Sequence, residues 1–243
     1  MIPIARGSLP AGLSTRMAQA TAKIAASAVP KNTAREKWQN ATVTRQDLKK
    51  QLLTMCARPS FCMYCYESRG TDVDHFTPII HDPLQTFDWD NHILACGFCN
   101  QQAKKETFPL DAAGHPLLLD PSVADFADHM TMASTGEFID LTPQGRETID
   151  VLGLNARSEL VDARHRSWRG VLRVFREAAT AQRPLDADDV EDLRFLPVVD
   201  AFHHFAHDIR TGRLAAKAVE PALARYALQS LPAIQAIFPR CNL

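Results

Sequence analysis

Two cysteine pairs of the form Cys-x-x-Cys constrain this chain more than any other feature of its sequence. Cys62 and Cys65 form the first pair, Cys96 and Cys99 form the second, and residues 66–95 lie between them. Each pair can turn back so that both thiolates face one ion, and four sulfurs complete a closed tetrahedral zinc site. A closed site leaves no position for a reacting water. The spacing therefore predicts a structural zinc, with further structure folded between the pairs.

The composition describes a globular chain that we expect to stay in the cytoplasm. The 243 residues include 46% hydrophobic side chains, and 27 Lys and Arg nearly balance 28 Asp and Glu, which is typical of one or two folded domains. No apolar run reaches the roughly 18 residues that a membrane span needs. Residues 1–13 lack the apolar core of a signal peptide. We therefore expect no membrane partner, and cysteines that bind metal rather than pair in disulfides.

Charge divides the chain unevenly. Residues 1–60 contain ten Lys and Arg and two Asp and Glu, a net charge of +8, so the other residues carry −9 of the total of −1. A basic arm before an acidic body is typical of a chain that contacts phosphate backbones with one part. A solvated helical face, or a surface for an acidic partner protein, would have the same composition.

The spacing of apolar residues and the positions of prolines predict helices and a few short strands. Strand-like runs occur at residues 71–76 and 92–96, and a third candidate covers residues 136–141. Thr142 followed by Pro143 predicts an N-cap with proline in the first helical position. The predicted helices cover residues 12–28, 34–57, 156–181, 186–210 and 214–238.

These elements predict an α+β fold that is mainly helical. We expect a basic N-terminal helical segment over residues 1–58, a small metal-centred module over residues 59–110 and a helical C-terminal region over residues 111–243. The helices on either side of the module would supply most of the hydrophobic core.

The residues between and after the cysteines suit phosphodiester hydrolysis. Asp74 and His75 end the first strand-like run, and Asn100 directly follows Cys99. Hydrolysis needs a base that deprotonates water and a divalent ion that stabilises charge on the phosphate. A neutral imidazole can be the base, which assigns that role to His75. Asp74 and Asn100 offer hard oxygen ligands for a catalytic Mg²⁺ or Mn²⁺.

The order Cys-x-x-Cys, Asp-His, Asn, Cys-x-x-Cys-Asn resembles the HNH endonuclease family. The resemblance implies a ββα-metal fold, stapled here by the four-cysteine zinc site. It also implies that Asn91 supports catalysis by holding the loop and orienting His75. The last motif position is often histidine in this family, so Asn100 makes this chain an H-N-N variant.

A narrower group is similar over residues 40–170, namely the HNH subunit of Septu-type anti-phage systems and the HNH effectors of retrons. This resemblance implies a defence nuclease that acts with an ABC-type ATPase. The chain contains no phosphate-binding P-loop motif, so an ATPase activity would come from another protein. The acidic C-terminal half is the expected docking surface. The similarity is based on residues 75–78, 87–91 and 149–155 with Leu160 and Arg164.

Other basic and histidine residues offer weaker signals. A helix that starts at Asn100 could direct Lys104 and Lys105 toward a phosphate backbone, although a solvated helix face has the same pattern. His203 and His207 have the i, i+4 spacing of metal ligands on a helix, but neither a zincin glutamate nor a nearby carboxylate pattern accompanies them. We therefore do not predict a metal site there.

Three functions fit these residues. The leading hypothesis is a metal-dependent endonuclease that cuts DNA, guided by the basic N-terminal helices. The second keeps the nuclease but makes the substrate RNA, such as transfer RNA, because this chemistry does not require a 2′-hydroxyl group. The third is a non-catalytic adaptor that binds nucleic acid on a zinc scaffold, and it would not need Asp74, His75 and Asn100 at these positions.

Overall fold

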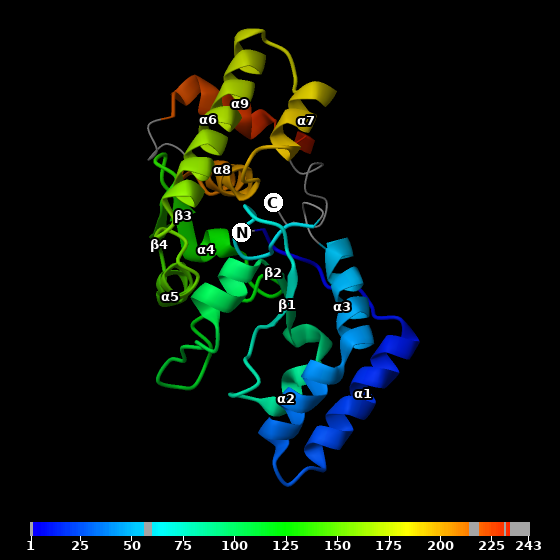
Figure 1. Ribbon diagram of the computed structural model, residues 1–243. Helices are drawn as coiled ribbons and strands as arrows, with labels where there is room; N and C mark the ends of the chain where they lie inside the picture. The colour runs from blue at the N-terminus through cyan, green and yellow to red at the C-terminus, as the bar shows by residue number, and fades with distance from the viewer. Residues whose placement is uncertain (1, 56–59, 214–218, 231, 234–243) are drawn as a thin grey trace.

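The elements of the chain form two helical groups that meet at a small β-hairpin (Figure 1). The computed structural model describes residues 2–55, 60–213, 219–230 and 232–233. The N-terminal helices lie on one side of the hairpin, and the C-terminal helices gather at the opposite end of the molecule. The mainly helical α+β fold that the sequence predicts is therefore confirmed at this level.

The central hairpin consists of β1 (Asp72–His75) and β2 (His92–Ala95), which pair antiparallel. His75 lies opposite His92 in the register. Both strands fall within the predicted runs, so these predictions are confirmed. A two-stranded hairpin is marginal by itself, and this one depends on the elements packed around it.

Short helical turns connect and follow the strands. Because side chains alternate along a strand, Asp72 and Asp74 share one face of β1, and His75 lies on the other. Within β1, the two carboxylates therefore lie on the face opposite His75. The turns are η1 (Pro83–Phe87) and η2 (Trp89–Asn91) between the strands, and η3 (Phe98–Lys104), a π-helix, after β2.

The N-terminal segment contains three helices where the sequence predicts two. These are α1 (Ala11–Ala25), α2 (Pro30–Asn40) and α3 (Thr42–Met55). The predicted single helix over residues 34–57 is wrong, because Ala41 has φ −87° and ψ 43° and the chain turns there. The turn lets α2 pack on η1 while α3 packs on β1 and β2.

The same three helices have a small hydrophobic core of their own. The core is closed by η1, which supplies Phe87 from inside the hairpin connection. The N-terminal helices are therefore fixed to the loop that follows His75. The fully buried members of this core are Leu13, Met17, Ile24, Ala34, Leu48 and Phe87.

After the hairpin, a second small sheet leads into the C-terminal helices. The strands β3 (Met130–Met132) and β4 (Phe138–Asp140) pair antiparallel, with α4 (Phe126–His129) before them. β4 confirms the predicted strand, whereas β3 was not predicted. The helix α5 (Pro143–Val151) begins as predicted, because the Thr142 hydroxyl accepts a hydrogen bond from the Gly145 amide.

The long helix α6 (Ser158–Thr180) organises the C-terminal region. It confirms the predicted core helix, and it packs against α7 (Ala187–Arg194), α8 (Asp200–Arg210) and α9 (Pro221–Gln229). The predicted helix over residues 186–210 is divided into α7 and α8. Part of the prediction over residues 214–238 lies outside the described residues. No helix in the part of the chain that the structure describes has the length and apolar character to cross a membrane.

Arg6 ties the start of the chain to the end of the hairpin connection. Its guanidinium donates hydrogen bonds to the carbonyl oxygens of Trp89 (2.8 Å), Asp90 (2.5 Å) and His92 (2.9 Å). Its Nε also donates to the Ser122 hydroxyl at 3.1 Å. One side chain thus satisfies two carbonyls of η2 and the carbonyl of the first residue of β2.

We predict that Arg6→Ala lowers the free energy of unfolding by about 2–3 kcal/mol, because it leaves partly buried carbonyl oxygens without a donor. Urea unfolding followed by circular dichroism measures the change. Arg16→Ala is the matched control, since Arg16 forms an exposed ion pair with Asp47 and such pairs contribute at most about 1 kcal/mol. Equal losses of unfolding free energy in the two variants would contradict this stabilising role of Arg6.

Candidate functional site

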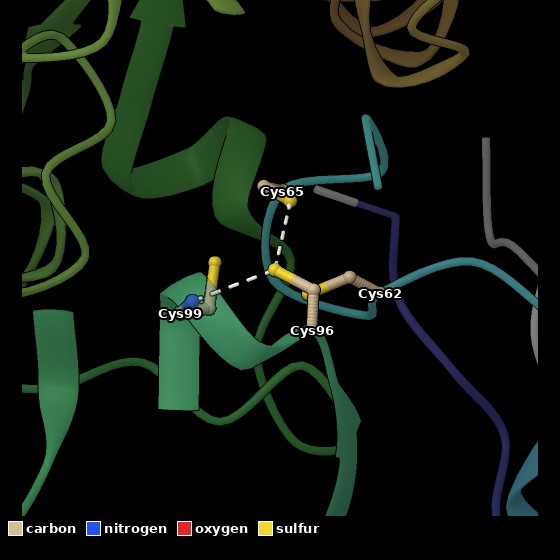
Figure 2. Close-up of side chains that lie close together, drawn as sticks. All are labelled: Cys62, Cys65, Cys96 and Cys99. Carbon is tan, nitrogen blue, oxygen red and sulfur yellow. Dashed lines mark hydrogen bonds between the residues drawn. The ribbon is translucent and has the colours of Figure 1, made fainter. Parts of the chain in front are cut away.

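The four cysteines of the two pairs form one buried cluster. Cys62 and Cys65 lie in the turn before β1, Cys96 directly follows β2, and Cys99 lies in η3. Their sulfur atoms all lie within 4.8 Å of one another, and Figure 2 shows them gathered around a common centre. Four buried thiols at this separation could hold a zinc ion, as the spacing predicts.

The surrounding chain is arranged for negatively charged sulfur. The Cys99 amide donates to the Cys96 sulfur at 3.4 Å. Arg157 places its Nη2 3.8 Å from the Cys99 sulfur and its guanidinium 4.4 Å from the centre of the Phe98 ring. Burial alone would lower the pKa of Arg157, but the charges of Cys99 and Cys65 raise it above its ordinary value. If the cluster holds zinc, Arg157 would offset part of the charge of the four thiolates.

We predict that the purified protein binds one equivalent of zinc and that Cys62→Ser loses both the zinc and cooperative unfolding, because a structural zinc contributes directly to folding. Metal analysis and thermal melting measure the two effects. Cys241→Ser is the control, since Cys241 belongs to neither pair. Retention of stoichiometric zinc by Cys62→Ser would contradict the assignment.

Asp74 is enclosed by two partners rather than open to an ion. Its carboxylate accepts a hydrogen bond from the Tyr64 hydroxyl at 2.8 Å and forms an ion pair with Lys104 at 3.1 Å. The Lys104 ammonium also donates to the His75 carbonyl at 2.6 Å. Burial raises the pKa of Asp74 above its ordinary value, although Lys104 and Tyr64 oppose that shift.

This arrangement corrects two expectations. Lys104 is fully buried, so it does not lie on a helix face that could contact a phosphate backbone. Asp74 is only 4% exposed, and its charge is already balanced by an ammonium group. Its carboxylate therefore does not fit the predicted role as a ligand of a catalytic Mg²⁺ or Mn²⁺.

We predict that Lys104→Met lowers the free energy of unfolding by about 3–5 kcal/mol, because it leaves a buried carboxylate unpaired. Adding Asp74→Asn to that variant should restore most of the loss. Lys105→Met is the matched control, since the neighbouring Lys105 is exposed. Equal stability of Lys104→Met and Lys105→Met in urea would contradict a structural role for the pair.

Asn100 lies beside Asp72, the other carboxylate on the same face of β1. The Asp72 carboxylate accepts hydrogen bonds from the Asn100 amide at 3.0 Å and the Gln101 amide at 2.7 Å. Burial alone would raise the pKa of Asp72, but these donors bring it below its ordinary value. Asp72 is therefore an ionised and partly exposed carboxylate.

A cleft of about 430 Å³ opens between α3 and the β1–η3 face. Arg45 and Lys49 come from α3, whereas Asp72 and Asn100 come from the opposite wall. The sequence patterns do not indicate Asp72 or Trp38 as site residues, and they include Arg45 only as one of the ten basic side chains of residues 1–60. Asp72 and Asp74 are two residues apart on one strand and so share a face. This spacing could have indicated two candidate metal ligands in place of one. The lining residues that matter here are Trp38, Arg45, Lys49, Asp72, Asn100 and Gln101.

His75 lies on the other face of β1 and is covered by α2. Its Nε2 is 3.0 Å from the Thr86 carbonyl oxygen, and the Trp38 ring packs edge-on against it with centroids 4.3 Å apart. His92 also contacts the Thr86 carbonyl, at 3.2 Å. Burial lowers the pKa of His75 to about 4, and the charge of Lys104 adds to this effect. His75 is therefore neutral near pH 7.

Asn91 holds the loop that follows β1. Its side-chain oxygen accepts from the Thr77 amide at 2.7 Å, and its Nδ2 donates to the Thr77 and Gln85 carbonyls at 3.0 and 3.1 Å. These bonds fix the loop between His75 and η1. They are the contacts that the predicted loop-holding role needs.

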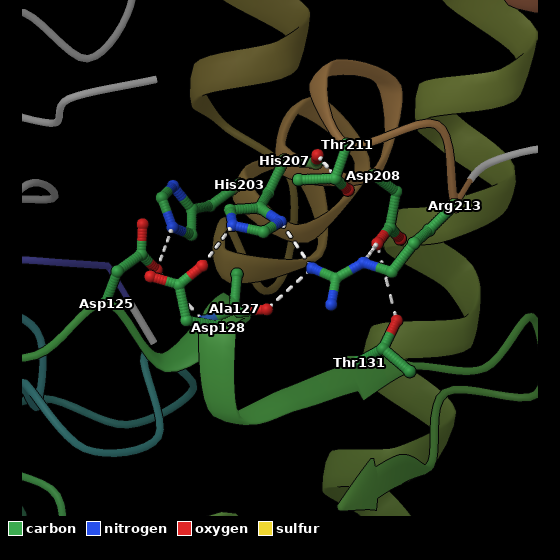
Figure 3. Close-up of polar contacts among 9 residues, drawn as sticks. All are labelled: Asp125, Ala127, Asp128, Thr131, His203, His207, Asp208, Thr211 and Arg213. Atoms are coloured by element: carbon green, nitrogen blue, oxygen red, sulfur yellow. Dashed lines mark hydrogen bonds and ion pairs between the residues drawn. The ribbon is translucent and has the colours of Figure 1, made fainter. Parts of the chain in front are cut away.

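A second group of histidines and aspartates lies between α4 and α8 (Figure 3). His203 contacts Asp125 at 3.0 Å and His207 contacts Asp128 at 2.9 Å, so carboxylates distant in sequence do accompany these histidines. Arg213 points a guanidinium nitrogen at Nδ1 of His207. Arginine only donates, so the His207 proton is on Nε2 and faces Asp128. This nitrogen does not offer a lone pair to a metal.

Comparison with known proteins assigns no family to the chain. It matches no protein-family model, and it matches no curated protein. Within the described residues, only the four cysteines bring together three or more Cys, His, Asp or Glu side chains that could hold one metal ion. The function of the chain is therefore inferred from the geometry of the hairpin and its cleft.

Proposed function

We propose that this protein is a metal-dependent HNH-type endonuclease that cuts phosphodiester bonds in DNA. The order of elements carries the proposal, since β1 and β2 are followed by η3 and all three are joined by the cysteine cluster. His75 ends β1, Asn91 immediately precedes β2, and Asn100 lies in η3. This order supports the proposal, because the motif has its three positions on two strands and the helix that follows them, although η3 is a π-helix.

His75 is the proposed general base. A carbonyl oxygen only accepts hydrogen bonds, so the contact with Thr86 requires the His75 proton to be on Nε2. That leaves Nδ1 with the lone pair that could take a proton from water. A base that is neutral at pH 7 is ready for this step. Asn91 supports His75 indirectly, because it holds the loop that leads to Thr86.

Trp38 separates His75 from the cleft. The indole comes from α2, contacts His75 and also lines the cleft. Arg45 and Lys49 in that cleft support binding of a phosphate backbone. Substrate would then reach His75 only after Trp38 shifts. The position of this one side chain would therefore distinguish the closed site from the open site.

Metal ions would have two separate tasks. A zinc in the cysteine cluster would fix the ends of the hairpin and of η3. A divalent Mg²⁺ or Mn²⁺ would stabilise the charge that develops on the phosphate.

The biological setting of the proposal is anti-phage defence with an ABC-type ATPase partner. It is based on the sequence resemblance to Septu-type and retron-associated effectors. The covered state of His75 is compatible with an effector that is silent until a partner acts on it. RNA, including transfer RNA, is the alternative substrate, because the chemistry of the site is the same for both polymers.

We predict that the purified protein nicks or linearises supercoiled plasmid in the presence of Mg²⁺ or Mn²⁺, and that His75→Ala lowers the rate at least about 100-fold because the base is removed. Gel electrophoresis follows the reaction, with total RNA as a parallel substrate and EDTA as the metal-free control. His81→Ala is the matched variant, since His81 lies on an exposed part of the loop.

Two outcomes would count against this function. Cleavage by His75→Ala at the wild-type rate would remove His75 from the mechanism. Metal-independent binding of DNA or RNA without any cleavage, even when an ATPase partner is added, would favour the adaptor hypothesis.

A further inference from the structure

The enclosure of Asp74 requires a different ligand for the divalent ion. Asp74 and Asp72 lie on the same face of β1, yet only Asp72 opens to the cleft. We propose that Asp72, together with Asn100, binds the divalent cation, and that Arg45 and Lys49 opposite them bind a phosphate of the nucleic-acid backbone. This inference rests on the proposed nuclease function, and it reassigns the metal site from Asp74 to Asp72.

Asp72 and Asn100 already lie in contact. The Asn100 Nδ2 is 3.0 Å from the Asp72 carboxylate, and the Gln101 Nε2 is 2.7 Å from it. Rotating a side-chain amide by half a turn exchanges its oxygen and nitrogen at little steric cost. With the Asn100 oxygen turned toward Asp72, a carboxylate and an amide oxygen would face one point. Hard oxygen pairs of this kind suit Mg²⁺ and Mn²⁺, which keep several waters.

Asp74 is enclosed in a different way. The Asp72 carboxylate accepts hydrogen bonds from neutral groups, the Asn100 and Gln101 amides on one oxygen and the Thr71 hydroxyl on the other at 2.9 Å. Both Asp74 oxygens contact the buried Lys104 ammonium, and one of them also accepts from Tyr64. An ion at Asp74 would have to displace a buried ammonium group, and that ammonium would then lie unpaired beside a divalent charge. The cost of such a rearrangement favours Asp72 as the ligand.

The opposite wall supplies the phosphate contacts. The Arg45 guanidinium lies 5.9 Å from the centre of the Trp38 ring, and its buried Nε has no hydrogen-bond partner among the described residues. Lys49 donates to the Thr71 carbonyl at 2.8 Å, directly before Asp72. The Trp38 ring orients this guanidinium, and one of its N–H groups is not used in a hydrogen bond with the residues that the structure describes. Such a guanidinium is well suited to bind a phosphate.

Charge balance explains why both walls are needed. Asp72 alone would repel a phosphodiester, whereas a divalent cation between them attracts both. Arg45 and Lys49 then neutralise the remaining charge of the backbone. The cleft volume of about 430 Å³ is equivalent to roughly ten or more waters at about 30 Å³ each. A hydrated ion and one phosphate group fit within it.

The test measures metal binding in full-length, zinc-loaded protein without any turnover. Mn²⁺ is titrated into the protein and the free ion is followed by electron paramagnetic resonance. We expect one Mn²⁺ site in the wild type and about tenfold or greater weakening in Asp72→Asn, because an ionised ligand is lost. The double variant Asp74→Asn with Lys104→Met, which removes Asp74 without leaving a buried charge, should bind Mn²⁺ as the wild type does.

Phosphate binding is tested in a His75→Ala background, which prevents cleavage. A fluorescein-labelled DNA duplex is titrated with protein, and anisotropy gives the affinity with Mn²⁺ and with EDTA. Arg45→Gln with Lys49→Gln should weaken binding and reduce the salt dependence by about two charges. Arg169→Gln with Arg173→Gln is the control, since both arginines are exposed on α6 and lie outside the cleft.

The outcomes separate this inference from the function it rests on. Loss of Mn²⁺ binding in the Asp74 double variant, with full binding in Asp72→Asn, would overturn the reassignment and leave the nuclease proposal intact. Absence of any Mn²⁺ site in folded wild-type protein would also overturn it. Cleavage that is independent of His75 would instead contradict the proposed function, whatever the Mn²⁺ titration gives.

Discussion

The cluster of four cysteines is the interaction on which the rest of the site depends. It joins the turn before β1, the end of β2 and the first turn of η3, and it does so beside a hairpin of only four residues in each strand. Strands this short gain little from their own hydrogen bonds. The contacts of Asp72 with Asn100 and of Asp74 with Lys104 both span β1 and η3. Both therefore need the cluster to hold η3 against the hairpin.

The sequence predicted those parts of the fold that local chemistry determines. The cap at Thr142 and the strands β1 and β2 follow from adjacent residues, and the cysteine cluster follows from the spacing of its pairs. The turn at Ala41 could not be predicted in this way, because alanine favours helix. The turn occurs where α2 and α3 pack against different elements. These tertiary contacts cannot be read from the residues around Ala41.

In the candidate site too, the residue types could be predicted from the sequence, whereas the burial of their side chains could not. The identity of Asp74, His75 and Asn100 was read from their order, but the depth of each side chain depends on distant segments. Tyr64 and Lys104 enclose Asp74, whereas α3 leaves Asp72 open to a cleft. Two aspartates separated by one residue thus acquire different chemistry. The same holds for His203 and His207, whose carboxylate partners lie on a segment about eighty residues earlier.

The clamp made by Arg6 has a consequence for how the chain reaches this fold. Synthesis delivers Ile2, Ile4 and Arg6 long before their partners, since the Ile4 amide bonds to the Pro121 carbonyl and Arg6 bonds to Ser122. Residues 2–6 must therefore wait, with two apolar side chains exposed, until residues 121 and 122 have emerged. Contacts so distant along the chain slow folding, and exposed apolar segments invite association. Residues 2–6 would thus be among the last parts of the fold to pack, after the hairpin and the cysteine cluster have formed.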